Sequence, residues 1–416
     1  MAAPAPPAAT PASFLADVPQ APPDPILGVS DAFRADTSPD RLNLGVGAYR
    51  TEEGAPWVLP VVREAETRLL ASGVDKEYLP IDGLAAFNAA TARLLLGDDS
   101  PALADGRVAT IQGLSGTGSL RVGAAFLAKF RPPGTVVYCS DPTWGNHFNI
   151  FGDAGLATAK YRYFHPATVG LDFEGMLADL GAAPPGSVIV LHGCAHNPTG
   201  VDPTREQWAA IADVCAARSL LPFFDVAYQG FASGDLDADA WAPRFFAHDK
   251  GLEILVAQSY SKNLGLYSER VGALNFVLAD PGAATRSLSQ AKRIARALYS
   301  NPPAHGARIV AAVVGDPALF AQWKTEMTAM AGRIKAVRTR LADELAAAAP
   351  GRDWGFVTRQ IGMFSFTGLT PAQVKRMTDV HHVYMTGDGR ISLAGLSEAK
   401  AGYLAAAMAD AIKEAA

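Results

Sequence analysis

Five residues that could do chemistry together each follow a short apolar stretch of the sequence. Lys262 stands in the run Gln-Ser-Tyr-Ser-Lys-Asn-Leu-Gly, Asp225 ends an apolar stretch, and Tyr228 follows it. Asn197 and Trp144 come after two other apolar stretches. A lysine amine is a nucleophile toward carbonyl groups, and a buried carboxylate can hold a positive charge. Taken singly, such an aspartate could cap a helix and such a lysine could be solvated surface, so the prediction of a site rests on their convergence.

A second group of residues has the chemistry of a phosphate anchor. The run Gly-Leu-Ser-Gly-Thr-Gly-Ser-Leu at 113–120 leads into an apolar helical stretch, where backbone N–H groups can approach an anion. Ser115 and Thr117 add hydroxyl donors, and Ser259 and Arg270 complete a set that would hold a monophosphate ester. The run lacks the Gly-Lys-Ser/Thr of a Walker A loop and the spacing of a dinucleotide fingerprint. A phosphate anchor, a buried aspartate and a lysine together indicate pyridoxal 5'-phosphate.

The elements that must position these groups alternate between strands and helices from about residue 100 to 280. Buried strands, rich in β-branched and aromatic residues, are predicted at 135–140, 187–193, 220–226, 253–259 and 271–279. Apolar residues at helical spacing predict helices at 122–130, 173–182 and 205–219. This alternation indicates an α/β fold, a mostly parallel sheet with helices on both faces. Ligands of such sheets bind beyond the carboxyl ends of the strands, where the candidate residues lie.

The C-terminal part has a different pattern, which predicts a smaller α+β domain. A long helical stretch at 315–349 leads to short strands at 362–366 and 390–395 and a final helix at 399–414. We expect four segments in the chain. They are an N-terminal arm at 1–23, a first part of the small domain at 24–56, a large cofactor-binding domain at 57–329, and a second part of the small domain at 330–416.

Composition excludes several other classes of protein. The 416 residues are 49% hydrophobic and carry a net charge of −5, which gives no bulk attraction for nucleic acid. No apolar run approaches the roughly 18 residues of a membrane helix. Three cysteines in apolar stretches favour a reducing compartment. The first Lys or Arg is Arg34, so neither an intact secretory signal nor an Arg-rich transit peptide is expected.

From about residue 22 to the C-terminus the chain resembles the aspartate aminotransferases, which are fold-type I pyridoxal phosphate enzymes. The similarity is closest to the eukaryotic-type subgroup, especially its mature mitochondrial forms. The motifs that carry it are PPDPILGV, NLGVGAYRTEEG, KEYLPIDGL, SGTGSLRVGAAFLAKF, PTWGNH, HNPTGVDP, DVAYQGFASGD, SYSKNLGLYSERVGA, YSNPPAHGARI, GMFSFTGL and DGRIS. Two departures are conservative, Ser119 and Ser261, each at a position where relatives carry alanine.

The resemblance implies a role for each candidate residue around the cofactor. Lys262 matches the Schiff-base lysine, which also moves the proton, and Asp225 matches the carboxylate that pairs with the pyridine nitrogen. Tyr228 and Asn197 match groups that hydrogen-bond the phenolic oxygen of the ring, and Trp144 matches the residue stacked on the ring face. The residues matching the phosphate ligands are Ser115, Gly116, Thr117, Ser259, Arg270 and, from the neighbouring subunit, Tyr78.

The resemblance also implies a substrate site for dicarboxylic amino and keto acids. Arg390 matches the arginine that clamps the α-carboxylate, with help from Gly47 and Asn197. Arg296 matches the arginine that takes the side-chain carboxylate from across a homodimer with shared active sites. The expected reaction is the reversible, ping-pong transamination of L-aspartate and 2-oxoglutarate to oxaloacetate and L-glutamate. Two alternatives stay open, an aromatic or broad-specificity aminotransferase and a non-catalytic regulator built on the same fold.

The histidines near these residues are predicted to support the site rather than to act in catalysis. His192 and His196 flank the Asn197 motif, but no third ligand lies near them, so no metal is expected. His147 and His192 are expected to support Asp225 from behind. For the compartment, the mature-mitochondrial match favours the mitochondrial matrix, with plastid and cytoplasm as alternatives.

Overall fold

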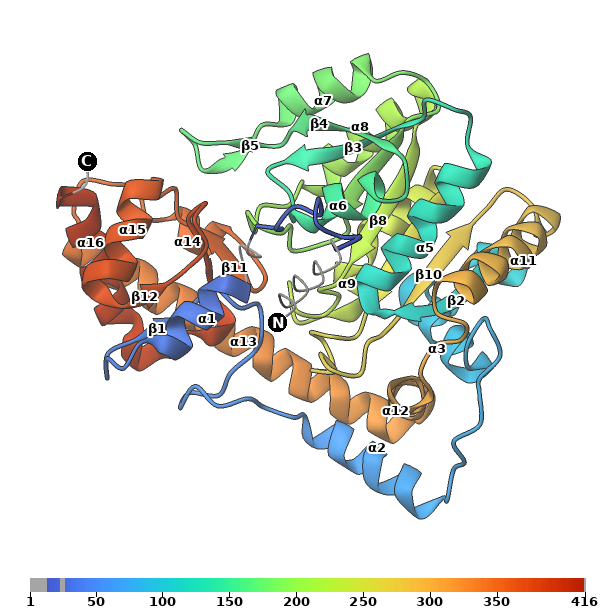
Figure 1. The fold of residues 1–416 in the computed structure, drawn as a ribbon, viewed down its shortest axis with the longest axis horizontal. Helices are drawn as coiled ribbons and strands as arrows, with labels where there is room; N and C mark the ends of the chain where they lie inside the picture. Colours follow the sequence, from blue (N-terminus) through green and yellow to red (C-terminus); the bar gives the residue numbers. More distant parts are fainter. Residues whose placement is uncertain (1–12, 23–26, 415–416) are drawn as a thin grey trace, which may run out of the picture.

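The structure, a computed structural model, describes residues 13–22 and 27–414, and its centre is a seven-stranded sheet (Figure 1). The strands lie in the order β2-β10-β9-β8-β7-β3-β4. Their bounds are Val108–Leu114 (β2), Val136–Asp141 (β3), Ala157–Arg162 (β4), Val188–His192 (β7), Leu221–Val226 (β8), Ile254–Ser259 (β9) and Val271–Val277 (β10). Every residue of β7, β9 and β10 is buried, as expected for strands covered on both faces.

The sheet is mostly parallel, as the sequence predicts, and one strand runs the other way. β3, β4, β7, β8 and β9 are mutually parallel, whereas β10 is antiparallel to both β9 and β2. The five strands predicted for this sheet are present within two residues of their expected bounds, whereas the strand predicted at 390–395 ends at Ser392. The two edge strands, β2 and β4, were not predicted. The sequence of β4, Ala-Thr-Ala-Lys-Tyr-Arg, is largely exposed and lacks an apolar run.

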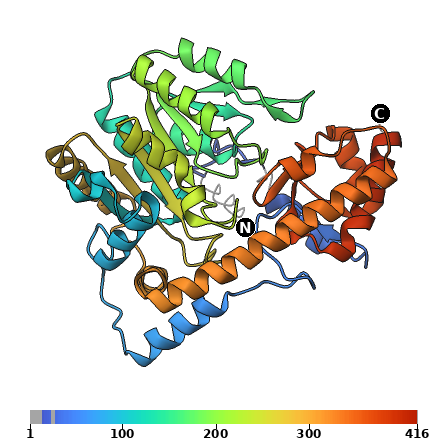
Figure 2. The ribbon, with the colours of Figure 1, turned by 180° about the vertical axis from the view of Figure 1, so that it is seen from behind.

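Helices cover both faces of the sheet (Figures 1 and 2). One face packs against α5 (Ser115–Phe130), α6 (Asn146–Gly152) and α11 (Pro281–Leu298). The other packs against α3 (Ala85–Leu96), α7 (Phe173–Ala182), α8 (Arg205–Arg218) and a short helical region from α10 (Trp241–Arg244) into the π-helix Phe245–Asp249. Short elements complete this part of the chain, namely α4 (Pro101–Ala104), α9 (Leu236–Asp239), and the ribbon of β5 (Phe164–His165) and β6 (Gly170–Leu171).

The first and last parts of the chain pack together beside this sheet. α1 (Leu27–Ala35) and β1 (Leu42–Asn43) lie against β12 (Val383–Tyr384), and β1 pairs with β12 in parallel. The remaining elements there are α14 (Phe356–Arg359), β11 (Phe364–Phe366), α15 (Pro371–His381), β13 (Arg390–Ser392), the 3-10 turns Leu393–Gly395 and Glu398–Lys400, and α16 (Ala401–Glu414). β11 and β13 form an antiparallel pair.

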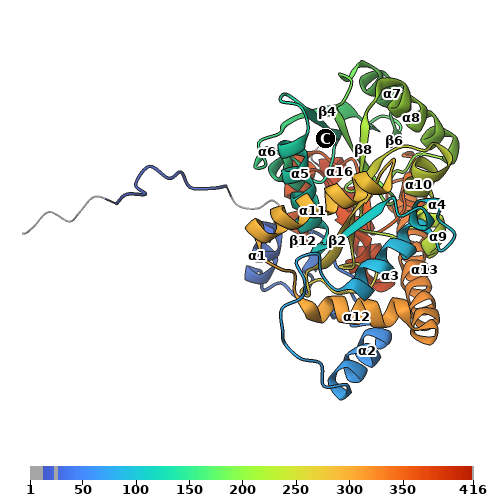
Figure 3. The same ribbon diagram turned by 90° about the vertical axis from the view of Figure 1, so that its right-hand side faces the viewer.

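Helix α13 (Pro317–Ala348) joins the two parts of the molecule. It packs on α12 (Ala304–Gly315) and α2 (Pro60–Ala71) at one end and on α14 and α16 at the other (Figure 2). The expected boundary at 329/330 falls inside this helix, and the division into four segments stays a prediction. Of the predicted arm, residues 1–12 and 23 lie outside the described residues; residues 13–22 are exposed and extend away from the body (Figure 3). The expected segment ends at 24–26 and 415–416 lie outside them too.

Two helix starts differ from the predictions for local reasons. The predicted loop 113–120 becomes helical at Ser115, directly after β2, so Gly113 belongs to the strand and Gly116 and Gly118 to the first turn of α5. The helix expected from about 315 begins at Pro317 instead, because Gly315 ends α12 and the Asp316 side chain caps the new helix by accepting the N–H groups of Ala318 and Leu319. Pro317 then occupies the first turn. Among residues 13–22 and 27–414, no helix combines the length and apolar character that crossing a membrane requires.

Candidate active site

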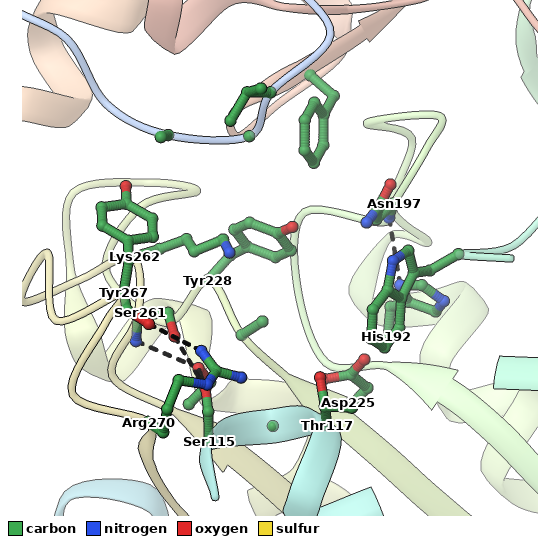
Figure 4. Close-up of a pocket in the computed structure, with 18 of the residues that line it drawn as sticks. Ser115, Thr117, His192, Asn197, Asp225, Tyr228, Ser261, Lys262, Tyr267 and Arg270 are labelled. Atoms are coloured by element: carbon green, nitrogen blue, oxygen red, sulfur yellow. Dashed lines mark hydrogen bonds between the residues drawn. The ribbon is translucent and has the colours of Figure 1, made fainter. Parts of the chain in front are cut away.

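A pocket of about 350 Å³ opens at the carboxyl ends of the central strands (Figure 4). It gathers most of the residues that the sequence singled out, from loops that follow five strands and from the C-terminal part of the chain. The predicted residues that line it are Gly47, Ser115, Gly116, Thr117, Trp144, Asn197, Asp225, Tyr228, Ser259, Lys262, Arg270 and Arg390. The convergence inferred from strand order therefore exists in the folded chain.

Lys262 projects into this pocket from the turn that follows β9, with its amine pointing toward the centre (Figure 4). Burial lowers the pKa of the Lys262 amine to about 8, repulsion from Arg270 adds to the effect, and the Asp225 carboxylate opposes it. The Nζ atom also lies 5.2 Å from the centre of the Tyr267 ring. An amine with this pKa is partly neutral near pH 7, which is the condition for acting as a nucleophile and as a base.

Asp225 receives support from a chain of side chains behind it. His147 Nε2 lies 3.1 Å from Asp225 Oδ2, and His147 Nδ1 lies 2.9 Å from the hydroxyl of Thr143. The same hydroxyl lies 3.2 Å from His192 Nε2, and His192 Nδ1 accepts the backbone N–H of Asn197. Burial lowers the pKa of His192 well below its ordinary value, so this ring is neutral.

Part of this chain has a defined direction. Because His192 is neutral and its Nδ1 accepts, its Nε2 carries the proton and donates to Thr143. The Thr143 hydroxyl can donate its own proton to His147 Nδ1, and the Asp225 carboxylate accepts from His147 Nε2. Sequence reasoning expected both histidines behind Asp225. The structure places His147 in direct contact and His192 one step further, through Thr143.

The residues expected to bind phosphate form one cradle at the start of α5. Ser115 Oγ lies 2.8 Å from both Ser259 Oγ and Ser261 Oγ. No side chain caps the N-terminus of α5, so its first N–H groups are available to an anion. Arg270 lies beside the serines, and its N–H donates to the Tyr267 carbonyl at 2.8 Å (Figure 4). Arg270 thereby brings a positive charge to a ring of hydroxyl groups.

The backbone around this cradle is tightly constrained. Ser115 and Arg270 both have left-handed backbone torsions, with φ of 62° and 51°. Such conformations cost about 1–3 kcal/mol each and are concentrated at binding sites. Gly272 passes so close to the neighbouring strand that a Cβ there would lie 2.3 Å from the Gln258 carbonyl oxygen. Only glycine allows this approach.

Tyr228, Trp144 and Asn197 line the pocket around Lys262 and Asp225. The Tyr228 ring lies beside the Lys262 amine (Figure 4), and burial raises the pKa of its phenol, which therefore stays protonated as a hydrogen-bond donor. The Trp144 ring stands edge-on to His147, with 5.3 Å between ring centres. The Trp144 ring thus packs against His147 at the pocket wall.

Arg390 is the buried cation on the other side of the pocket. It is 4% exposed and donates to the Gly45 carbonyl at 2.8 Å and to Asn197 Oδ1 at 3.2 Å. Its guanidinium carbon lies 4.3 Å from the centre of the Phe364 ring. Its Nε has no hydrogen-bond partner among the described residues. A buried guanidinium with free donors and no salt bridge to a carboxylate among the described residues is suited to bind the carboxylate of a ligand.

Two predicted residues, Tyr78 and Arg296, do not line the pocket of their own chain. Tyr78 is 87% exposed and borders a separate surface hollow of about 910 Å³, together with Tyr299 and Ser300. Arg296 is exposed on the last turn of α11 and donates to the Ser300 hydroxyl. Both residues were expected to act on a neighbouring subunit, and their position on an outer surface is compatible with that expectation.

Sequence reasoning missed two aromatic residues of the pocket, Tyr267 and Phe364. Tyr267 lies inside the motif that contains Arg270, and its hydroxyl accepts the N–H of Tyr49 at 2.9 Å. Ser261, noted only as a departure from relatives, is part of the serine cradle. No cluster of potential metal ligands occurs among residues 13–22 and 27–414.

Comparison with known proteins identifies the family. Residues 39–408 match the family model "Aminotransferase class I and II". This chain belongs to the class I and II aminotransferases. Among curated relatives, the aminotransferase is 64% identical to aspartate aminotransferase P2, mitochondrial, of Lupinus angustifolius, over 94% of this chain and 86% of that protein. It is also 64% identical to the chloroplastic aspartate aminotransferase of Arabidopsis thaliana, over the same shares.

Solved structures with the same fold include two kinds of aminotransferase. The aromatic-amino-acid aminotransferase of Burkholderia pseudomallei, covalently bound to pyridoxal phosphate, is 47% identical, with a TM-score of 0.93, covering 96% of this chain and 100% of that one. The cytoplasmic aspartate aminotransferase of Saccharomyces cerevisiae is 42% identical, with a TM-score of 0.94, covering 97% and 99%. The aminotransferase therefore has the fold-type I architecture expected from its sequence.

Proposed function

We propose that this aminotransferase catalyses the reversible, pyridoxal 5'-phosphate-dependent transamination of L-aspartate and 2-oxoglutarate to oxaloacetate and L-glutamate. The observation that carries the proposal is the pairing, in one pocket, of an amine of lowered pKa with a buried guanidinium that keeps free N–H donors. Lys262 supplies the amine, and Arg390 supplies the guanidinium. The amine can bind an aldehyde and move a proton, and the guanidinium can hold a carboxylate beside it.

The residues of the pocket fit this cofactor. The uncapped N-terminus of α5, the hydroxyl groups of Ser115 and Ser259 and the Arg270 guanidinium are suited to the phosphate. Asp225 stands further along the same pocket (Figure 4), where it would pair with the protonated pyridine nitrogen. When bound, pyridoxal phosphate supplies an aldehyde that condenses with amines and a ring that withdraws electrons from the substrate Cα.

The chain's own residues then have separate tasks. The Lys262 amine takes the proton from the substrate Cα and returns it to the other carbon of the reacting pair. Its lowered pKa keeps the neutral form available for the first of these transfers. The histidine chain holds the Asp225 carboxylate as an acceptor, because His147 can only donate to it. Tyr228 and Asn197 are placed to hydrogen-bond the phenolic oxygen, and Trp144 to pack on the ring.

We further propose that the active unit is a homodimer in which each chain completes the site of the other. Tyr78 and Arg296 support this, because both lie on an exposed surface outside their own chain's pocket. In such a dimer Tyr78 would contact the cofactor phosphate and Arg296 the side-chain carboxylate of the substrate. Arg390 would hold the α-carboxylate with Gly47 beside it, and two arginines at opposite ends of the substrate would select dicarboxylic acids.

A second candidate activity is transamination of aromatic amino acids, because several similar solved structures are those of aromatic amino acid aminotransferases. The curated relatives at 64% identity are named aspartate aminotransferases, which favours aspartate. The test is kcat/KM for aspartate against phenylalanine, in wild type and in Arg296→Asp. We expect aspartate to be preferred by wild type and its turnover to be lost in the variant. A clear preference of the wild type for phenylalanine would reject the aspartate proposal.

The cofactor and the half-reaction have a direct spectroscopic test. Purified protein saturated with pyridoxal phosphate should absorb in the visible, and aspartate alone should shift the band to that of the amine form of the cofactor. Protein without such a chromophore would reject the proposal. For the compartment we propose the mitochondrial matrix, from the resemblance to mature mitochondrial forms. Because matching relatives are named for mitochondria, chloroplasts and the cytoplasm, cell fractionation with marker enzymes is the test.

A further inference from the structure

Arg338 is a second buried arginine, and none of the roles assigned above uses it. It lies in the middle of α13, is 3% exposed and has no carboxylate partner among the described residues. Its guanidinium instead donates to three backbone carbonyls, those of Val357 at 2.7 Å, Gly362 at 2.9 Å and Phe364. Burying a cation without an anion is costly unless its N–H groups are satisfied. Three of the five N–H groups of Arg338 donate to these carbonyls, and its Nε has no partner among the described residues. The three carbonyls are therefore the groups that keep Arg338 in place, and Arg338 in turn fixes them.

The segment 357–364, whose carbonyls accept hydrogen bonds from Arg338, packs against the loop that carries Asn197. Ile361 donates its N–H to the Gly200 carbonyl at 2.7 Å. Gly362 has a φ of 79°, and a Cβ on it would lie 2.4 Å from Ala195 Cβ. Since both neighbours belong to the 195–200 loop, this segment is in contact with α13 on one side and with the wall of the active site on the other.

The same segment leads directly to the substrate side of the pocket. Phe364 begins β11, which pairs with β13 so that Phe366 lies opposite Arg390 and Phe364 opposite Ser392. The Phe364 ring also contacts the Arg390 guanidinium, at 4.3 Å. A Cβ added to Gly47 would lie 2.7 Å from the tip of that ring. The position of Phe364 therefore determines both the strand pairing that holds the Arg390 backbone and the ring that contacts the Arg390 guanidinium.

We propose that Arg338 is a positioning residue for recognition of the substrate carboxylate, acting through the Phe364 carbonyl, the β11–β13 pair and Arg390. This inference rests on the proposed function, in which Arg390 binds the α-carboxylate. Arg338 does not touch the pocket itself, so its effect is on the placement of Arg390. Of the cofactor groups of the pocket, Asn197 adjoins this path, whereas Lys262, Asp225 and the phosphate cradle lie on other strand ends of the large sheet. A purely structural role would lower stability and leave carboxylate affinity unchanged.

The test compares Arg338→Met, Arg338→Lys and a control, Arg340→Met, as holoenzymes. Arg340 lies on the same helix with a side chain 57% exposed, paired only with Glu344. Succinate, a dicarboxylate without an amino group, is titrated by calorimetry, and kcat and KM for aspartate are measured beside it. We expect Arg338→Met to bind succinate about tenfold more weakly and to raise KM by a similar factor, since about 1.4 kcal/mol changes an affinity tenfold.

Other readouts separate the possible outcomes. The kcat of Arg338→Met should change much less than its KM, and the cofactor absorption band should be that of wild type. Arg338→Lys keeps the charge but cannot reach all three carbonyls with one nitrogen, so its succinate affinity should lie between those of wild type and Arg338→Met. Succinate affinity within about twofold of wild type in the folded variants would overturn the proposal. If Arg338→Met does not fold, the same criterion applies to Arg338→Lys. Wild-type enzyme without aspartate turnover would instead reject the proposed function.

Discussion

Replacing Arg390 by lysine tests the carboxylate clamp most directly. A guanidinium has five N–H donors. In Arg390 one donates to Gly45 and one to Asn197, which leaves three for a ligand. Lysine offers one nitrogen, so it can make at most one of the two hydrogen bonds to a carboxylate and leaves a buried acceptor without a donor.

The size of the effect follows from these contacts. A hydrogen bond to a charged group contributes about 1.5–3 kcal/mol, and an unsatisfied buried acceptor costs about 1–3 kcal/mol. Together they amount to about 2.5–6 kcal/mol, which is roughly a 10²- to 10⁴-fold loss of kcat/KM. Aspartate and alanine should lose activity by similar factors, because both have the α-carboxylate that Arg390 is proposed to bind. The assay is steady-state transamination of each amino acid with 2-oxoglutarate.

The control for Arg390→Lys is Arg359→Lys, in which an exposed arginine paired with Asp353 is changed in the same way. This variant should keep wild-type kinetics, and both variants should keep the cofactor band. The reasoning is refuted if Arg390→Lys retains kcat/KM for aspartate within about tenfold of wild type. It is also refuted if the loss occurs with aspartate alone, because Arg390 would then serve the side-chain carboxylate.

Three further predictions follow from the same geometry. In the apoenzyme, the rate of reaction of Lys262 with trinitrobenzenesulfonate should have its midpoint near pH 8. Arg270→Gln should move this midpoint upward, because removing a nearby cation favours the charged amine. A downward shift would contradict the repulsion argument. Lys262→Ala and Arg296→Asp should each be inactive toward aspartate. When the two variants are unfolded, mixed and refolded together, they should regain about a quarter of wild-type activity, because half of the dimers then contain one complete site. No recovery in the refolded dimers would argue against shared sites. Gly272→Ala should lower the free energy of unfolding by about 1–3 kcal/mol through overlap with the Gln258 carbonyl, and an unchanged denaturation midpoint would show that the strand can shift.

The sequence was sufficient to predict the sheet edge of the site because strand ends are simple to locate. Buried runs rich in Val, Ile and Phe end at His192, Asp225 and Ser259, and parallel strands must present those ends together. Glycine and serine before a helix predicted the phosphate cradle for a similar local reason. In both cases the chemistry follows directly from neighbours in the chain, so no tertiary contact had to be known.

Residues whose roles depend on tertiary contacts could not be predicted in this way. Tyr267, Phe364 and Arg338 have no periodicity or spacing that marks them, and their importance comes from partners far away in the chain. Arg390 was predicted only through the family resemblance, because in isolation it reads as a surface residue. The start of α5 at Ser115 was missed since glycines within the run indicated a loop rather than a first helical turn.

Arg390 also explains how binding at the pocket can act on the whole molecule. The residue belongs to β13 in the C-terminal part, yet it donates to Gly45 in the N-terminal segment and to Asn197 beside the central sheet. Three segments that are remote in sequence therefore meet at one guanidinium. A substrate carboxylate bound there adds charge-assisted hydrogen bonds at this junction and strengthens the contact between the two parts. Because Arg390 lies at this junction, such a gain would favour a closer approach of the C-terminal part to the sheet and exclude water from the reacting atoms.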